Sequence, residues 1–435
     1  MFINKLFELS WMMDIKNLFE NQLIILNQFQ KKRIYWRKIF NTFVLNNKIT
    51  GIVGPRGVGK TTFLLHTALS NGALEGQALF ISADHIYFLE HSILDLVDQL
   101  YKETEVKLLC IDEIHKQPNW QQVLKNIADI YGGGGFKILF TGSSVIDIVY
   151  GKIDLSRRVT LHELYGFSFR EYLEFYLDIS LPVIENINTL FLQHTQLAQD
   201  LISKMPSNFL WHFKKYLTEG YYPFYSELET TYEKAQATHN MALKTIYEDI
   251  AILHALKTPS LLVIEQLYKY SLSMTSGELN INKLANALNK DFSSVETYLN
   301  FLVQAGLLQF LYAKQIGKGV LKKPVKFYPE NTNLIYASFL NQPPENFIGQ
   351  VRETFVMNQM KILRQSIFYS EIGDFQIEDF LLEVGGKNKT TKQLQAVKNQ
   401  NQNQNQNKKQ GYVLADGILT GLKNTVPLYL LGFLS

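Results

Sequence analysis

The chain has 435 residues, of which 46% are hydrophobic and 13% aromatic, and its formal net charge is +3 at pH 7. This composition excludes a disordered protein, and the length exceeds what one hydrophobic core organises, so we expect several folded domains. The near-neutral charge neither requires nor excludes a nucleic-acid partner, because a basic face can be local.

The cysteine content and the hydropathy pattern indicate where the protein works. Cys110 is the only cysteine, which excludes an intramolecular disulfide and a cysteine zinc cluster. No stretch approaches the ~20 apolar residues of a membrane span. We therefore expect a cytoplasmic protein without a membrane partner.

The first part of the chain predicts a parallel sheet. Residues 1–40 have the spacing of a helical segment. From residue 41 to 167, short apolar runs alternate with helical patterns, as in KITGIVG, TTFLLHTALS, QALFISAD, SILDLVDQL, KLLCIDE, QQVLKNIADIYG and KILFTGSS. This alternation is typical of parallel strands joined by crossover helices, so we predict an α/β domain over residues 41–167.

The remaining residues predict three further units. The apolar spacing is helical over 168–258, as in FREYLEFYL. Residues 259–324 read as short helices followed by a hairpin strand, the outline of a winged helix. Residues 325–435 combine strand-like pieces such as VKFYP and FLLEV with a helix around 351–363, which indicates a separate α/β unit. Within it, the low-complexity run at 399–410 cannot bury apolar surface, and we expect a flexible surface insertion.

Residues 54–61 read GPRGVGKT and match the phosphate-binding pattern G-x-x-x-x-G-K-[ST]. The glycines let backbone N–H groups wrap around phosphate oxygens, and the following helix points its positive end at the anion. A strand-like ITGIV precedes the loop and a helical TTFLLHTAL follows it, which is the context that the pattern requires. We expect the phosphates to contact the loop and the start of its helix: Gly54, Pro55, Arg56, Gly57, Val58, Gly59, Lys60, Thr61 and Thr62.

An apolar strand that ends in acid completes the expected site. It reads LLCIDE at residues 108–113. Thr61 and Asp112 are the candidate Mg²⁺ residues, Asp112 acting through water, and Glu113 is the candidate general base. The next strand ends in TGSS, where Thr141 or Ser143 can sense the γ-phosphate; the alternative is a plain turn of small polar residues.

The expected nucleotide is ATP. A GTPase usually reads guanine with an Asn-Lys-x-Asp motif. The nearest match, at residues 289–292, ends in phenylalanine and lies outside the first domain. Its absence favours adenine.

The order of these motifs resembles that of a known family. The P-loop is followed by IDEIHK at 111–116, TGSS at 141–144, Arg157-Arg158-Val159 and GFSFREY at 166–172. The series is similar to the AAA+ ATPases of bacteria and archaea that carry a restriction-endonuclease-like C-terminal domain. Over nearly the whole chain, the resemblance implies a P-loop AAA+ parallel-sheet ATPase domain, a helical lid, a winged helix and a nuclease-like α/β domain.

The resemblance also implies a role for one of two arginines. In such proteins an arginine just before the fifth strand reaches the nucleotide of a neighbouring subunit. Arg157 or Arg158 is therefore a catalytic candidate, and a homo-oligomer is implied. The alternative is a surface arginine that forms a salt bridge.

The C-terminal domain departs from the family's nuclease pattern. That pattern has a glutamate on a helix, an aspartate on a strand, and Glu-x-Lys on the next strand around a metal. Glu353, Asp374 and Glu383 match in order, whereas Lys387 lies two positions too far along the chain. On a regular strand this doubles its separation from Glu383 to ~13 Å, so we expect a degenerate domain that does not cleave DNA.

The sequence of the C-terminal half does not decide between DNA and protein as its partner. A DNA-binding winged helix carries a basic recognition helix, yet residues 293–304 contain no lysine or arginine. Both DNA and protein remain possible partners. The primary hypothesis is an ATPase that uses ATP and Mg²⁺ to change the conformation of its C-terminal domains. The alternatives are a nucleotide-gated binding module with little hydrolysis and an ATP-controlled DNA nuclease.

Overall fold

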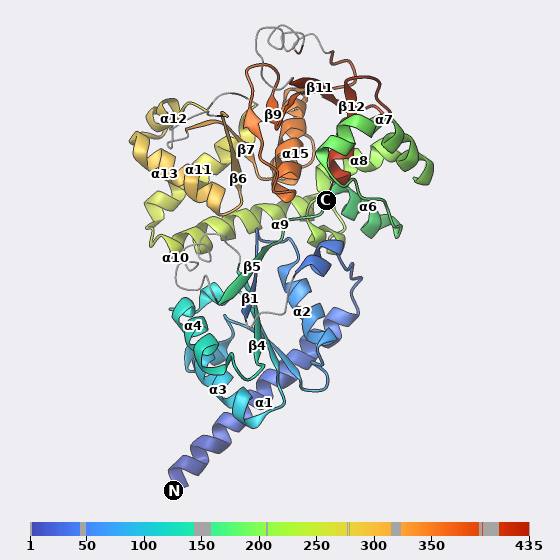
Figure 1. Ribbon diagram of the computed structural model, residues 1–435. Coiled ribbons are helices and arrows are strands. Elements are labelled where there is room, and N and C mark those ends of the chain that lie inside the picture. Colours follow the sequence, from blue (N-terminus) through green and yellow to red (C-terminus); the bar gives the residue numbers. More distant parts are fainter. Residues whose placement is uncertain are drawn as a thin grey trace. The chain divides into compact units, whose positions relative to one another are not determined.

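The computed structural model describes residues 2–43, 49–142, 158–205, 208–275, 277, 279–314, 323–390, 394 and 409–434, with backbone alone for residues 2–14. Ser143, Arg157 and most of the low-complexity run lie outside these residues. The chain divides into two compact units, Met1–Tyr165 and Gly166–Ser435 (Figure 1).

The first unit is built on a five-stranded sheet with the order β2-β3-β4-β1-β5. All its neighbouring strands are parallel, which confirms the predicted parallel sheet. Helix α2 lies on one face, and α3 and α4 lie on the other (Figure 1). The elements are α1 (Phe2–Gln30), η1 (Lys38–Thr42), β1 (Ile49–Val53), α2 (Lys60–Ser70), β2 (Ala78–Ser82), η2 (Ile86–Leu89), α3 (Ile93–Glu103), β3 (Leu108–Asp112), η3 (Ile114–Lys116), α4 (Trp120–Tyr131), β4 (Lys137–Gly142) and β5 (Val159–Glu163).

Alternate residues of the strands build the core of this unit. Leu109, Ile111, Ile138 and Phe140 share one face of the sheet and belong to a single buried cluster with apolar residues of α3 and α4. Successive strand residues point to opposite faces, so the apolar residues between them face α2. Helix α3 begins where the Ser92 side chain accepts a hydrogen bond from the backbone N–H of Asp95 at 3.1 Å.

Helix α1 covers the outer edge of the sheet through one buried side chain. The Gln22 amide nitrogen donates to the carbonyls of Ala73 and Ala78 at 3.2 and 3.4 Å. Its amide oxygen accepts from the backbone N–H of Phe80 at 2.5 Å. One glutamine side chain therefore satisfies outward-facing backbone groups of β2 that a further strand would otherwise pair.

The second unit contains helices, a hairpin and a second sheet. The hairpin pairs β6 with β7, and the five-stranded sheet has the order β12-β11-β10-β9-β8. Its elements are α6 (Phe169–Leu177), α7 (Ile187–Lys204), α8 (Phe209–Glu219), η4 (Pro223–Glu227), α9 (Thr231–Lys244), η5 (Thr245–Ile250), α10 (Ala251–Leu253), α11 (Thr258–Ser273), α12 (Ile281–Leu288), α13 (Phe292–Gln304), β6 (Leu308–Tyr312), β7 (Pro324–Pro329), α14 (Thr332–Ser338), η6 (Glu345–Phe347), α15 (Ile348–Ile362), β8 (Phe368–Tyr369), β9 (Phe375–Ile377), β10 (Phe380–Gly385), β11 (Gln410–Ala415), β12 (Thr425–Pro427) and η7 (Leu428–Phe433).

The FSFREY sequence has a structural explanation. Ser168 and Glu171 form a capping box at the start of α6, each side chain bonding the other's backbone N–H. Arg170 forms a 2.7 Å ion pair with Glu174, and both side chains are buried. Phe169 packs edge-on against Phe433 of η7 at a ring-centroid distance of 5.7 Å. This segment therefore joins the helical part of the unit to its C-terminal strands and turns.

Buried polar contacts tie the later segments to the helical part as well. The Asn333 amide donates to the carbonyl of Leu217 at 2.9 Å and accepts from the N–H of Tyr221 at 2.8 Å. The order α11, α12, α13 and the antiparallel β6–β7 hairpin follows the predicted winged-helix outline. The winged helix, the nuclease-like domain and the boundaries inside this unit stay predictions.

Candidate nucleotide site

The P-loop connects the end of β1 to the start of α2 in the first unit. Gly54 has φ 154°, and a Cβ atom there would lie 1.9 Å from the carbonyl oxygen of Leu164, so no larger residue fits. Gly59 precedes α2 with φ 97°, a left-handed conformation that glycine adopts without strain. The strand–loop–helix context that the motif requires is therefore present.

Lys60 is buried inside the loop that precedes it. Its ammonium donates to the carbonyls of Gly54 and Pro55 at 2.8 and 2.7 Å. These two bonds hold the charge at the concave side of the loop. A phosphate bound by the loop N–H groups would meet this ammonium directly.

Asp112 and Thr61 meet at the carboxyl end of the sheet. The Thr61 hydroxyl donates to Asp112 Oδ2 at 2.8 Å, and the Thr141 hydroxyl donates to Asp112 Oδ1. Burial raises the pKa of the Asp112 carboxyl, and the bonds from the two threonines oppose that rise. The structure thus brings together residues from α2, β3 and β4 that are separated by 51 and 29 positions in the sequence.

The hydroxyl of Thr61 and the carboxylate of Asp112 fit a magnesium ion. Mg²⁺ keeps several waters and takes few protein ligands besides the substrate's phosphates. Within the described part of the chain, no three His, Cys, Asp or Glu side chains are arranged to hold a metal ion. With one hydroxyl and one carboxylate, the Thr61–Asp112 pair suits an ion whose other ligands are waters and phosphate oxygens.

Glu113 follows β3 in a left-handed conformation, with φ 52°. Its backbone N–H donates to the Thr141 hydroxyl at 3.0 Å, so Thr141 contacts both acidic residues. Its carboxylate pairs with Arg56 of the P-loop at 3.4 Å. Left-handed backbone is uncommon outside glycine, asparagine and aspartate, and such strain occurs often at functional sites.

Of the two candidate arginines, the structure describes only Arg158. Arg157 lies outside the described residues, as does Ser143. Arg158 immediately precedes β5 and forms two hydrogen bonds with Asp129 of α4, at 2.7 and 3.2 Å. Its guanidinium is thus engaged within its own chain.

Sequence reasoning missed Arg37. This residue is only 4% exposed, and its guanidinium donates to the carbonyl of Tyr165 at 2.6 Å and to that of Val58 at 3.4 Å. Arg37 therefore links the P-loop, through Val58, to Tyr165. The sequence showed only a cluster of basic residues, and no local signal separates this buried arginine from its exposed neighbours.

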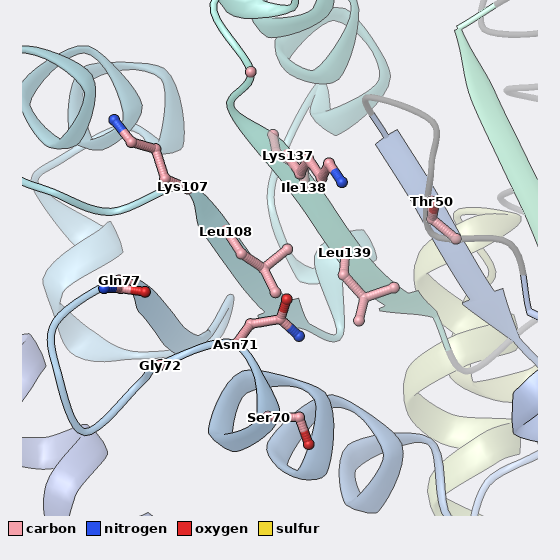
Figure 2. Close-up of a pocket in the computed structure, with 11 residues that line it drawn as sticks. Thr50, Ser70, Asn71, Gly72, Gln77, Lys107, Leu108, Lys137, Ile138 and Leu139 are labelled. Atoms are coloured by element: carbon pink, nitrogen blue, oxygen red, sulfur yellow. The ribbon is translucent and has the colours of Figure 1, made fainter.

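A hollow of about 550 Å³ lies elsewhere in the first unit. It opens between the end of α2 and the amino ends of β3 and β4, with Asn71, Leu108 and Leu139 around it (Figure 2). Lys107 and Lys137 also line it. The P-loop follows the carboxyl end of β1, and the strands are parallel, so this hollow lies at the opposite edge of the sheet from the phosphate site.

Comparison with known protein families finds two regions of the chain that match. Residues 46–173 match the family model described as an AAA domain. This region has a P-loop α/β fold similar to that of AAA domains. Residues 210–343 match a second model, described as a domain of unknown function (DUF8612).

The likenesses to individual proteins extend over more of the chain and are weaker. The chain is 24% identical over 319 residues to the uncharacterized protein MJ1544 of Methanocaldococcus jannaschii, and the match covers 71% of this chain and 66% of that protein, just under two thirds. A replication initiator DnaA bound to AMPPCP and single-stranded DNA is 16% identical, with a TM-score of 0.26, covering 63% of this chain and 91% of that one. A RuvB variant from Thermotoga maritima gives the same identity and TM-score over 68% and 89%. TM-scores this low do not establish a shared overall fold.

The described helices include none with the length and apolar character that membrane crossing requires.

Three acidic residues of the second unit interact, since, besides burial, the charges of Glu353 and Glu383 both raise the pKa of the Asp374 carboxyl. Glu353 accepts a hydrogen bond from Tyr328 at 2.7 Å and lies 3.5 Å from the Lys326 ammonium. Asp374 accepts from the backbone N–H of Val384 at 2.8 Å, and Glu383 pairs with Lys389.

Lys389, rather than Lys387, is the lysine beside Glu383. Strand β10 ends at Gly385, and a turn follows in which the N–H of Lys389 bonds the carbonyl of Gly386 at 2.9 Å. The turn returns the chain toward the strand, which a continuing strand would not do. Glycines such as Gly385 and Gly386 permit the chain to fold back, but the Glu-x-Lys pattern pointed to Lys387 and gave no reason to select Lys389.

Proposed function

We propose that the chain binds ATP with Mg²⁺ at residues 54–62 and hydrolyses it to change the conformation of its second unit. The observation that carries this proposal is the network at the carboxyl end of the sheet. Thr61, Asp112, Thr141 and Glu113 are linked by hydrogen bonds directly beside the P-loop. The match of residues 46–173 to an AAA domain supports it.

Each residue has a role in this proposal. Loop N–H groups and Lys60 hold the β- and γ-phosphates, while Thr61 and Asp112 hold the magnesium ion, which neutralises phosphate charge. Glu113 accepts a proton from water as the water oxygen bonds the γ-phosphorus. The bond from that phosphorus to the β-phosphate oxygen breaks, which releases ADP and phosphate. Thr141 positions Asp112 and Glu113 relative to each other, and Ser143 remains a second candidate to sense the γ-phosphate.

A homo-oligomer would bring an arginine from a neighbouring subunit to the nucleotide. Arg157 and Arg158 are the candidates. For Arg158 this role requires that it leave Asp129, a pair whose side chains are 33% and 49% exposed and which is therefore of small energetic cost.

The direct test is phosphate release by the full chain with ATP, with and without Mg²⁺, and with and without DNA. We expect turnover that requires Mg²⁺. Tight ATP binding without phosphate release would instead support the nucleotide-gated binding module.

A metal-dependent nuclease is the second candidate function, because Glu353, Asp374 and Glu383 interact and Lys389 pairs with Glu383. Two of these carboxylates already pair with lysines, and no metal-binding group of three acidic or histidine side chains occurs among the described residues. We therefore expect no cleavage of plasmid DNA with Mg²⁺ or Mn²⁺. Cleavage that disappears in Asp374→Ala and Lys389→Ala, but persists in Lys387→Ala, would establish the nuclease instead.

The Asp374 carboxyl should make stability depend on pH. Burial and the nearby Glu353 raise its pKa from 3.8 to about 6. The folded state therefore favours the protonated acid, so this contribution to stability is complete below pH ~4 and is lost as the pH rises to about 6. We expect Asp374→Asn to match the wild type near pH 4 and to exceed its free energy of unfolding by up to about 3 kcal/mol at pH 7.5.

Urea unfolding of both proteins across this pH range measures the difference. Asp379→Asn is the matched control, because Asp379 lies on the same hairpin and is exposed. A difference between Asp374→Asn and wild type that stays constant with pH would contradict the prediction.

A further inference from the structure

Arg56 belongs to the P-loop, yet its guanidinium points at the candidate general base. Its Nη1 lies 3.4 Å from Oε1 of Glu113, and the two side chains are only 11% and 21% exposed. For comparison, the surface pair of Lys102 and Asp98 has side chains 62% and 38% exposed. Charges that are shielded from water interact more strongly, so the Arg56–Glu113 pair is more than a surface contact.

The position of Glu113 in this pair is fixed by its backbone. The residue follows β3 in the left-handed conformation, with φ 52°, and its backbone N–H donates to the Thr141 hydroxyl. These two features hold the Glu113 backbone at a place from which its carboxylate reaches Arg56. The Arg56–Glu113 pair therefore belongs to the candidate nucleotide site.

The two cations of the loop have different partners. Lys60 donates to the carbonyls of Gly54 and Pro55, whereas Arg56 forms an ion pair with the carboxylate of Glu113, which follows β3. A terminal phosphate that lies against the loop and within reach of a water on Glu113 must approach the Arg56 guanidinium. A guanidinium binds carboxylate and phosphate with the same planar geometry, so it can exchange one for the other.

We propose that Arg56 exchanges Glu113 for the γ-phosphate of ATP. Arg56 then holds Glu113 until a nucleotide with a third phosphate binds, and it distinguishes ATP from ADP. This inference rests on the proposed function of the same site. Arg56 is then the residue that binds the γ-phosphate, and the loss of its pair with Glu113 frees the general base.

The exchange predicts effects on affinity that differ between nucleotides. Arg56→Ala should weaken binding of AMPPCP, an ATP analogue, by about tenfold and leave ADP affinity within about twofold, because ADP has no group for Arg56 to bind. Glu113→Gln should tighten AMPPCP several-fold, since the arginine no longer has to leave a charged partner. The double variant should lose that gain.

Calorimetry with AMPPCP and ADP, each with Mg²⁺, on wild type, both single variants and the double variant tests the exchange. Arg56→Lys keeps the charge without the planar group and should fall between wild type and Arg56→Ala. Lys102→Ala, which breaks the exposed pair in the same unit, is the control and should change neither affinity.

Two results would overturn the inference. Equal weakening of AMPPCP and ADP in Arg56→Ala would mean that the arginine only shapes the loop. A gain from Glu113→Gln that persists without Arg56 would mean that the two residues are not coupled. If wild type binds neither nucleotide, the proposed function itself fails, which is a distinct outcome.

Discussion

Replacing Lys60 with alanine is expected to weaken ATP binding by at least about 100-fold. The Lys60 ammonium is buried and lies on the concave side of the loop, where it bonds Gly54 and Pro55. The lost contacts are charge-assisted hydrogen bonds to the β- and γ-phosphates, each of about 1.5–3 kcal/mol. Calorimetry measures the loss directly.

The control for this variant is Lys107→Ala, which removes an exposed lysine at the opposite edge of the same sheet. Lys60→Met keeps the apolar stem and removes only the charge, so it separates loss of the phosphate contact from damage to the loop. Wild-type affinity in Lys60→Met, with the fold verified by circular dichroism, would contradict the site assignment.

Glu113→Gln should bind ATP but lose turnover by roughly 10²-fold or more, the scale expected for removal of a general base. Glutamine keeps the shape of the side chain and cannot accept the proton. Single-turnover phosphate release at saturating ATP measures the chemical step without the change in affinity. Glu105→Gln, an exposed glutamate before β3, is the matched control, and an unchanged rate in Glu113→Gln would assign the base to another residue.

Local sequence patterns predicted the P-loop and the parallel strands of the first unit. They did not predict contacts between residues that are far apart in the chain. The P-loop and the parallel strands follow from spacing and turn chemistry within short windows of sequence. The Arg56–Glu113 pair and the contact of Arg37 with Tyr165 join residues far apart in the chain, and no local rule selects one partner among many charged residues.

The FSFREY sequence shows a different limit. Its likeness to a family motif predicts no local structure, whereas in the structure it forms a capping box and a buried ion pair. The Ser-x-x-Glu spacing at Ser168 and Glu171 is itself a helix-start signal, so the cap was available to sequence reasoning. The burial of Arg170 was not, because it depends on residues packed from elsewhere in the unit.

In the second unit, the lysine that lies beside Glu383 depends on where strand β10 ends. Alternation along an extended chain predicts that Lys387 lies far from Glu383, but it applies only while the strand continues. Strand β10 ends at Gly385, and the turn that follows brings Lys389 to the carboxylate instead. The end of a strand depends on tertiary packing, which the alternation rule does not include.

The Gln22 amide gives the N-terminal helix a protective role. An edge strand whose backbone N–H and C=O groups are unpaired can pair with a strand of another molecule. In this chain a side chain fills part of that edge at β2, and it does so from a helix that precedes the entire nucleotide-binding domain. Loss of residues 1–30 would thus spare every phosphate-binding residue and leave the backbone groups of Ala78 and Phe80 without the Gln22 amide, at an edge where another chain can pair.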